Sequence, residues 1–195
     1  MTTQNKIIEL SDKDIRKYVH EIIRQLGTWR PDYIVGITRG GLVPATMLSH
    51  YLDIPMQTLN VSFRDDDLGP ESNLWMAEDA YGYIPKEERT DAEIEISMLP
   101  IAGDTSDPKK RKKILIVDDI NDSGRTLNWI KEDWASGCLP NNPAWADIWH
   151  NTVRFAVIVD NSASNFDGVD YCGTEINKLE TPSWVVFPWE QWWKN

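Results

Sequence analysis

The chain has 195 residues, of which 41% are hydrophobic and 26% are charged, as in an ordinary soluble protein with a single domain. Its net charge of −11 argues against a general nucleic-acid binder, which needs a basic surface. No apolar run approaches the roughly 20 residues that span a bilayer, so neither nucleic acid nor membrane is an expected partner. The two cysteines, Cys138 and Cys172, fit no disulfide framework or metal spacing, which predicts reduced thiols and a cytoplasmic protein.

The first third of the chain alternates predicted helices and strands. A helix is expected over 11–27, because a polar cap and an acidic first turn begin it, apolar residues recur at helical spacing, and a glycine ends it. A short apolar strand is expected over 33–37, a helix over 42–52 and a second strand over 56–63. This order is typical of a parallel α/β unit.

The stretch 64–107 differs from its surroundings in being acidic and rich in turn-forming residues. Within it, only residues 93–99 show strand-like alternation. Structureless loops of this length are uncommon unless they are functional. We therefore expect a long insertion or lid that crosses the sheet edge.

Regular elements return in the last third of the chain. Residues 114–117 predict a buried strand, 126–135 a helix, and 137–151 a connection with a short helix around Trp145. The almost wholly apolar run 155–159 predicts a strand in the interior of a sheet.

Residues 114–126, ILIVDDINDSGRT, combine an apolar strand with two adjacent carboxylates and a small-residue turn that opens a helix. In open parallel sheets, ligands bind at the carboxyl ends of strands. The N–H groups of the turn favour a phosphate, whereas Asp118 and Asp119 can accept hydrogen bonds from sugar hydroxyls or hold Mg²⁺. The alternative is an ordinary strand–turn–helix with solvated acids.

A second turn, within residues 34–44 (IVGITRGGLVP), follows an earlier strand. Gly40 and Gly41 let the backbone approach a ligand closely, and Arg39 can neutralise charge on a leaving group. The alternative is a tight turn with a solvent-facing arginine.

Both strings resemble motifs of the type I phosphoribosyltransferases, in particular those that act on xanthine, guanine or hypoxanthine. The first resembles the signature that binds 5-phosphoribosyl-1-pyrophosphate (PRPP), and the second resembles the pyrophosphate loop. The tail 182–190, PSWVVFPWE, is similar to the C-terminal hood of the purine enzymes. The likeness covers 33–63, 114–135 and 153–190.

The fold that this resemblance implies is α/β, with a central parallel sheet flanked by helices. We expect one domain over 1–195, with an insertion at about 64–113 and a small hood from about 160–195, to which the N-terminus is a candidate contributor.

The resemblance also implies a role for each motif residue. PRPP ribose and Mg²⁺ would be held by Asp118 and Asp119. The 5-phosphate would be bound by Asp122, Ser123, Gly124, Arg125 and Thr126. The pyrophosphate would be bound by Arg39, Gly40 and Gly41, with a cis peptide between Thr38 and Arg39. Asp122 would handle the proton of the base and Arg39 would stabilise the leaving group. The base would lie against Trp184 and Val185, whereas Trp189, Trp192 and Trp193 suit core or interface packing.

One departure from the family pattern concerns the base. The 6-oxopurine enzymes usually carry Lys-Pro after the strand that matches 155–159, and that lysine donates to the O6 oxygen. This chain has Asp160-Asn161 instead, and a carboxylate only accepts. Either Asn161 supplies the donor from its amide, or the specificity has moved towards an amino group.

The expected activity is transfer of the phosphoribosyl group from PRPP to a free purine base, with guanine, xanthine or hypoxanthine favoured and Mg²⁺ as the cofactor. A homo-oligomer, either a dimer or a tetramer, is expected. A PRPP-binding regulatory protein without turnover is the first alternative. A Mg²⁺-dependent phosphohydrolase that uses Asp118, Asp119 and Asp122 is the second.

Overall fold

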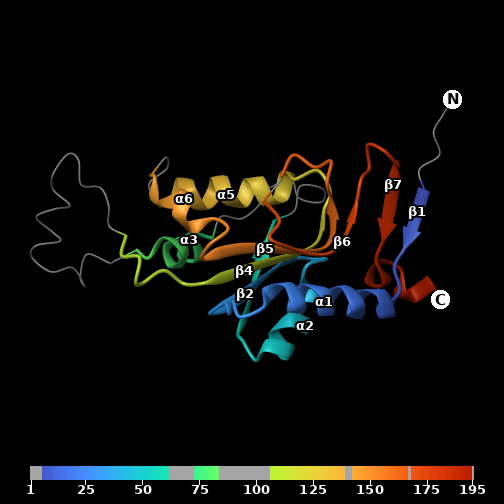
Figure 1. Cartoon of the computed structure of the whole chain (residues 1–195), viewed down its shortest axis with the longest axis horizontal. Coiled ribbons are helices and arrows are strands. Elements are labelled where there is room, and N and C mark those ends of the chain that lie inside the picture. The colour runs from blue at the N-terminus through green and yellow to red at the C-terminus, as the bar shows by residue number, and fades with distance from the viewer. Residues whose placement is uncertain (1–5, 62–72, 84–105, 139–141, 167, 195) are drawn as a thin grey trace, which may run out of the picture.

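The core of the molecule is a five-stranded parallel sheet with strand order β3-β2-β4-β5-β6 (Figure 1). The computed structural model describes residues 6–61, 73–83, 106–138, 142–166 and 168–194. The sheet strands are β2 (Tyr33–Thr38), β3 (Met56–Asn60), β4 (Ile114–Asn121), β5 (Val153–Asn161) and β6 (Tyr171–Ile176). The predicted fold class is confirmed.

Helices cover both faces of this sheet (Figure 1). On one face lie α1 (Asp12–Leu26) and α2 (Leu42–Leu52). On the other lie α3 (Leu74–Tyr81), α5 (Arg125–Gly137) and α6 (Ala144–Ile148). One hydrophobic cluster forms under each layer, and β4 passes between the two, with its residues 114–117 at most 1% exposed. Burial on both faces explains why the inner strands are continuous apolar runs.

Local sequence signals position α1. The Ser11 side chain accepts from the Asp14 amide and the Asp14 carboxylate accepts from the Ser11 amide, so the helix begins with a capping box. Gly27 follows the last residue with a φ of 55°, a conformation that favours glycine. The side chains of Ile15, Val19, Ile22 and Leu26 are buried against the sheet, so the amphipathic pattern holds the helix there.

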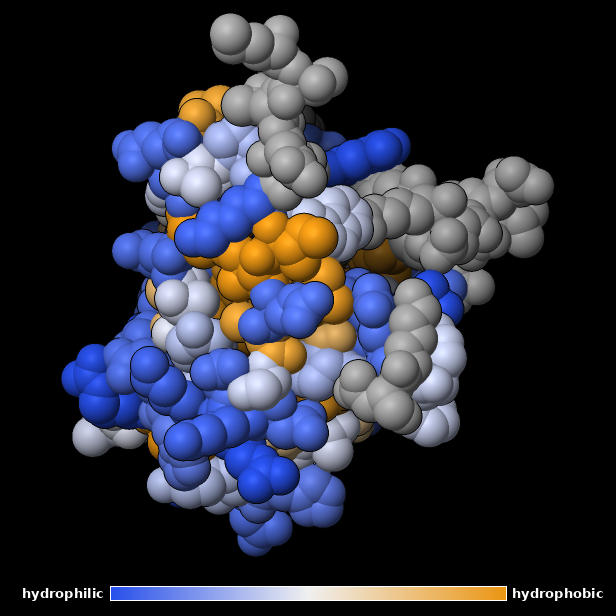
Figure 2. Space-filling view, turned by 90° about the vertical axis from the view of Figure 1, so that its right-hand side faces the viewer, coloured by the Kyte–Doolittle hydropathy of each residue, from blue (hydrophilic) through white to orange (hydrophobic). Residues whose placement is uncertain are grey.

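A separate two-stranded sheet lies at one end of the molecule. Strand β1 (Lys6–Glu9) pairs in parallel with β7 (Ser183–Val186), and the 3₁₀ helices η2 (Pro188–Glu190) and η3 (Trp192–Lys194) follow. Figure 2 looks onto this end, where hydrophobic side chains gather in the middle of a largely hydrophilic face. Residues near the N-terminus thus form one strand of this small sheet, and residues of the C-terminal tail form the other. Strand β6, however, lies within the proposed hood segment but belongs to the central sheet.

The structure differs from the sequence prediction at two further places. Helix α3 lies inside the predicted loop, and its buried residues pack against α5 and α6. Strand β4 continues through Asn121 instead of ending at Val117. Residues 64–72 and 84–105 of the insertion, which include the strand-like stretch 93–99, lie outside the described residues.

Within the part of the chain that is described, no helix combines the length and apolar character that a membrane crossing requires.

Candidate active site

An open cleft of about 1250 Å³ lies at the carboxyl ends of β2 and β4, beside the small sheet. It is lined by most of the predicted site residues, namely Arg39, Gly40, Asp118, Asp119, Asp122, Ser123, Gly124, Arg125, Thr126, Trp184 and Val185. Two predicted residues, Gly41 and Asn161, are not among its lining residues. Three motifs far apart in the sequence therefore share one cleft, at the sheet edge where parallel α/β proteins bind ligands.

Two adjacent carboxylates line the cleft, of which Asp118 is buried and Asp119 is half-buried. The amide of Asp119 donates to Asp118 Oδ1 at 2.9 Å, which holds the two side chains in adjacent positions. Burial raises the pKa of the Asp118 carboxyl well above its usual range, and the charge of Asp119 raises it further. Burial also raises the pKa of Asp119 to about 6, with the charge of Glu190 as a second cause. Both carboxylates are thus in an environment that disfavours their negative charge.

Those same carboxylates fit the expected Mg²⁺. A divalent cation would offset the charge repulsion that burial amplifies, and carboxylate oxygens are the ligands that Mg²⁺ takes. Among the described residues, no group of three or more His, Cys, Asp and Glu side chains is arranged to hold a metal ion. A pair of carboxylates matches a common way of binding Mg²⁺, in which substrate phosphates supply the remaining ligands.

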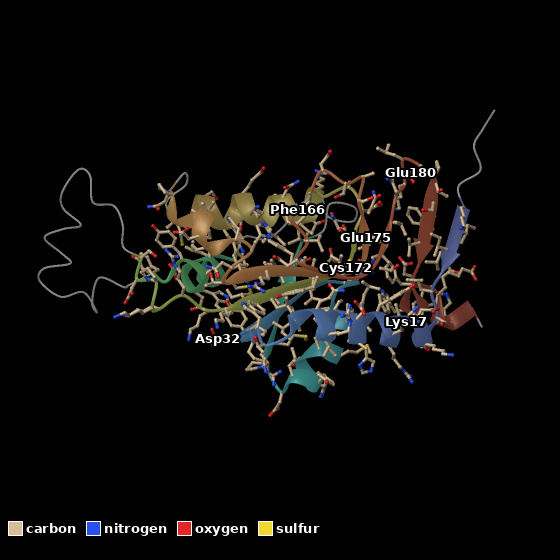
Figure 3. The ribbon with its side chains drawn as sticks, in the orientation of Figure 1. Lys17, Asp32, Phe166, Cys172, Glu175 and Glu180 are labelled. Carbon is tan, nitrogen blue, oxygen red and sulfur yellow. The ribbon has the colours of Figure 1, made fainter. Side chains whose placement is uncertain are left out.

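The N-terminal end of α5 faces the cleft. Gly124 precedes the helix with a φ of 83°, and an added Cβ would lie 2.6 Å from the Phe166 backbone nitrogen. Phe166, labelled in Figure 3, lies beside this end of the helix. The N-cap residue Gly124 makes no side-chain cap hydrogen bond, and the Arg125 amide donates to Ser123 Oγ over a long 3.4 Å. The first amides of α5, together with the positive end of its dipole, therefore form a site suited to an anion.

The turn of residues 39–41 packs directly against Asp118 and Asp119. The peptide between Thr38 and Arg39 is cis, as predicted. An added Cβ at Gly40 would lie 1.7 Å from Asp119 Oδ2, and one at Gly41 would lie 2.4 Å from the Val117 carbonyl oxygen. Gly40 thus permits close approach of the Asp119 carboxylate, whereas Gly41 lets the turn pack on β4.

The Gly40→Ala variant tests this contact. We expect it to fold, because Asp119 can rotate away, but to lose affinity for PRPP about 10-fold or more, since the carboxylate would leave its position. Isothermal titration with PRPP and Mg²⁺ measures the effect. Unchanged affinity in a folded Gly40→Ala protein would show that the contact is unimportant for binding.

The small sheet provides the aromatic wall of the cleft. Trp184 is 48% exposed, as a stacking surface requires, and Val185 beside it is buried. Trp189, which was predicted from the sequence to have a packing role, also lines the cleft. Its ring stacks on that of Phe187, with the two ring centroids 4.9 Å apart. Glu190 Oε2 accepts from the Phe187 amide at 2.9 Å, which anchors the segment after β7.

The structure shows which groups the predicted base-binding residue Asn161 contacts within the protein. The residue is 5% exposed, and its amide is committed to the backbone: Nδ2 donates to the Asp122 carbonyl, and Oδ1 accepts from the amides of Ala163 and Lys178. These hydrogen bonds place Asn161 beneath Asp122 and Lys178, and it is not among the residues that line the cleft.

Lys178 also lines the cleft, although no sequence motif predicted it. Its Nζ lies 2.6 Å from Asp122 Oδ1, inside the cleft. A lone lysine in a polar loop carries no local signal of function. The contact joins residues 56 positions apart and requires the folded chain.

Comparisons with known proteins agree with this geometry. The family model described as "Phosphoribosyl transferase domain" matches residues 2–194. The xanthine-guanine phosphoribosyltransferase of Cereibacter sphaeroides is 28% identical over 164 residues, which is 84% of this chain and 71% of that protein. Xanthine phosphoribosyltransferase 1 of Saccharomyces cerevisiae is 23% identical over 201 residues, covering 96% of this chain and 91% of that protein.

Among solved structures, a purine phosphoribosyltransferase from Pyrococcus horikoshii superposes with a TM-score of 0.59 at 22% identity and covers 95% of both chains. This likeness supports the fold. The family model matches nearly the whole chain and therefore supports family membership as well as the fold. The arrangement of the acidic pair, the helix N-terminus and the glycine turn agrees with that assignment. The chain belongs to the phosphoribosyltransferase family.

Proposed function

We propose that this protein transfers the 5-phosphoribosyl group of PRPP to a free oxopurine, namely xanthine, guanine or hypoxanthine, giving a nucleoside 5-monophosphate and pyrophosphate. One observation carries the proposal. A single cleft contains a carboxylate pair, an open helix N-terminus, a glycine turn with an arginine, and an exposed indole face. These groups match, in order, a ribose, a phosphate, a pyrophosphate and a planar base.

The chemistry assigns each group a role. The bond from ribose C1 to the pyrophosphate oxygen breaks, and a bond from C1 to a ring nitrogen of the base forms. The base sheds a proton, which Asp122 accepts. Arg39 and the amides of its turn stabilise the charge on the departing pyrophosphate, and Ser123 to Thr126 hold the 5-phosphate. Trp184 stacks on the base, with Val185 beside it.

Mg²⁺ fits this scheme as the cofactor, held by Asp118 and Asp119. When bound, it would neutralise phosphate charge and orient PRPP. The two acids would also accept hydrogen bonds from the ribose hydroxyls.

The substrate class rests on the relatives as well as on the cleft. The curated relatives described above are named for xanthine or guanine, so we favour an oxopurine over adenine. They are also named as enzymes, which favours turnover over PRPP binding alone.

We further propose a single-domain protein with a cytoplasmic location, consistent with two free cysteines. A homo-oligomer would use exposed aromatic surface, and Trp192 and Trp193 near the C-terminus are 72% and 61% exposed.

Chromatographic detection of nucleotide tests the function. The protein is incubated with PRPP, Mg²⁺ and one of guanine, xanthine, hypoxanthine, adenine, uracil or orotate. We expect a nucleoside monophosphate from at least one oxopurine, and none when EDTA removes the metal. PRPP binding without product from any base would favour the regulatory alternative. Release of phosphate without a base would favour a hydrolase.

A further inference from the structure

An ion pair in the cleft links two loops that are distant in sequence. Asp122 lies just after β4, and Lys178 lies in the loop between β6 and β7, which Glu180 marks in Figure 3. The Lys178 Nζ is 2.6 Å from Asp122 Oδ1, and the two side chains are 18% and 34% exposed. Both residues line the cleft. The pair is thus partly sheltered from solvent, yet it remains accessible to a ligand.

The backbone around Lys178 is firmly held. Its amide donates to Asn161 Oδ1 at 3.0 Å. The next two amides, of Leu179 and Glu180, donate to Asn177 Oδ1 at 3.0 and 3.2 Å. The Leu179 side chain is 83% exposed, so this loop directs an apolar residue to solvent while its lysine enters the cleft. That distribution is the reverse of what burial preferences alone would give.

Asn161 connects the two halves of the pair. While its Oδ1 accepts from the Lys178 amide, its Nδ2 donates to the Asp122 carbonyl oxygen at 2.8 Å. The residue is 5% exposed and is the last residue of β5 in the main sheet. One buried amide therefore ties together the backbones that carry the ammonium and the carboxylate.

The two charged groups have complementary hydrogen-bonding abilities. An ammonium only donates, and a carboxylate only accepts. A 6-oxopurine presents, side by side on one edge, an oxygen that only accepts and a ring nitrogen that sheds a proton during the proposed reaction. Adenine presents an amino group, which donates, in place of that oxygen. The edge of an oxopurine therefore matches the Lys178–Asp122 pair, and the edge of adenine does not.

We propose that Lys178 determines base specificity by donating to the oxo group of the purine, while Asp122 takes the proton from the neighbouring nitrogen, and that Asn161 is the positioning residue for both. This inference rests on the proposed function. It assigns the oxo-group donor to the loop between β6 and β7 instead of to the end of β5, where Asn161 is already committed.

Hypoxanthine and adenine are the test pair, because they differ at the 6-position. The Lys178→Met and Lys178→Arg proteins are compared with wild type and with Lys17→Met, a control on α1 (Figure 3). For each, kcat/KM is measured for hypoxanthine, adenine is measured as substrate or competitive inhibitor, and the PRPP dissociation constant is determined.

For Lys178→Met we expect kcat/KM for hypoxanthine to fall about 10- to 100-fold, while adenine binds as well as before or better. Lys178→Arg should recover part of the loss. The PRPP dissociation constant of Lys178→Met should equal that of wild type, and Lys17→Met should match wild type in all three measurements. An unchanged preference between the two bases in an active Lys178→Met protein would overturn the inference. Absence of turnover by wild type with every base would instead overturn the proposed function.

The positioning role has its own readout. Asn161→Ala should lower kcat/KM for hypoxanthine in the wild-type background. It should lower kcat/KM much less when Lys178 is already Met, because both substitutions disrupt the same placement of the Lys178 ammonium beside Asp122. Equal effects in the two backgrounds would show that Asn161 acts on stability alone.

Discussion

Replacing Asp122 with Asn is expected to reduce kcat about 10²- to 10⁴-fold while leaving the fold and PRPP binding nearly intact. Asn has the same shape as Asp but cannot accept the proton that the base must lose, and loss of a positioned proton acceptor has this range of effect. The backbone of residue 122, which receives a hydrogen bond from Asn161, is unchanged by the substitution. The phosphate-binding turn should therefore keep its conformation.

Pre-steady-state and steady-state nucleotide formation measure this effect, and titration calorimetry measures PRPP affinity. Asp53→Asn is a matched control: Asp53 is exposed and has a φ of 55° at the end of α2, a conformation that Asn tolerates. The assignment of Asp122 as proton acceptor would be wrong if Asp122→Asn retained wild-type turnover. If PRPP affinity collapsed together with kcat, the side chain would instead be needed for binding.

Replacing Asp119 with Asn should have opposite effects on function and stability. Burial, with Glu190 nearby, raises the pKa of Asp119 from 3.8 to about 6. Between these two pH values the folded chain binds more protons at this site than the unfolded chain does. The free energy of unfolding therefore falls as the pH rises from about 4 to about 6, and the loss persists above that range.

An uncharged amide at residue 119 removes this penalty. At pH 7.5 we expect Asp119→Asn to raise the free energy of unfolding by about 1–3 kcal/mol and to flatten its dependence on pH between 4 and 6. PRPP affinity in the presence of Mg²⁺ should fall about 10- to 100-fold, because a charged hydrogen-bonding partner is lost. Such a trade-off is common where a site requires an unfavourable charge.

Urea unfolding at pH 4.5 and 7.5, with and without PRPP and Mg²⁺, separates the two effects. The wild-type protein should gain stability from the ligands at pH 7.5, and Asp119→Asn should gain little. Lower stability of Asp119→Asn at pH 7.5 would contradict the electrostatic explanation. Asp53→Asn serves as the control here as well.

The elements that the sequence predicted well are those whose signals are local. The start and end of α1 follow from Ser11, Asp14 and Gly27, and the bounds of α2 follow from the glycine turn that precedes it. The acidic pair and the helix after it were found because strand, carboxylates and turn are consecutive in the chain. In each case the residues that specify the structure are close together in sequence.

The elements that were missed depend on tertiary contacts. Helix α3 is eight residues long and lies in an acidic stretch, although its buried Met76, Ala77, Ala80 and Tyr81 do recur at helical spacing. Strand β6 is an edge strand with mainly half-buried side chains, so it lacks the apolar run of β5. Strand β4 continues past Val117 because pairing with β5 extends through Asn121. At such places tertiary contacts, more than local secondary-structure propensity, determine where an element forms and ends.

The sequence motifs identified residues that the fold brings into one cleft, with Gly41 and Asn161 outside its lining. Asn161 was assigned to the base from its position after a strand, but long-range hydrogen bonds determine what its amide contacts. Only the folded chain brings Lys178 to Asp122, since the loop between β6 and β7 has no motif of its own.

The parallel pairing of β1 with β7 has a consequence for protein synthesis. Lys6–Glu9 is translated long before Ser183–Val186, so β1 has no strand partner while the central sheet is being made. The phosphate-binding motifs are complete at a point when Trp184 has not yet been translated. A nascent chain that ends before β7 would thus have the residues proposed to bind PRPP but not Trp184, which is proposed to stack on the base. Under the proposed function, nucleotide synthesis would have to wait for the emergence of the tail.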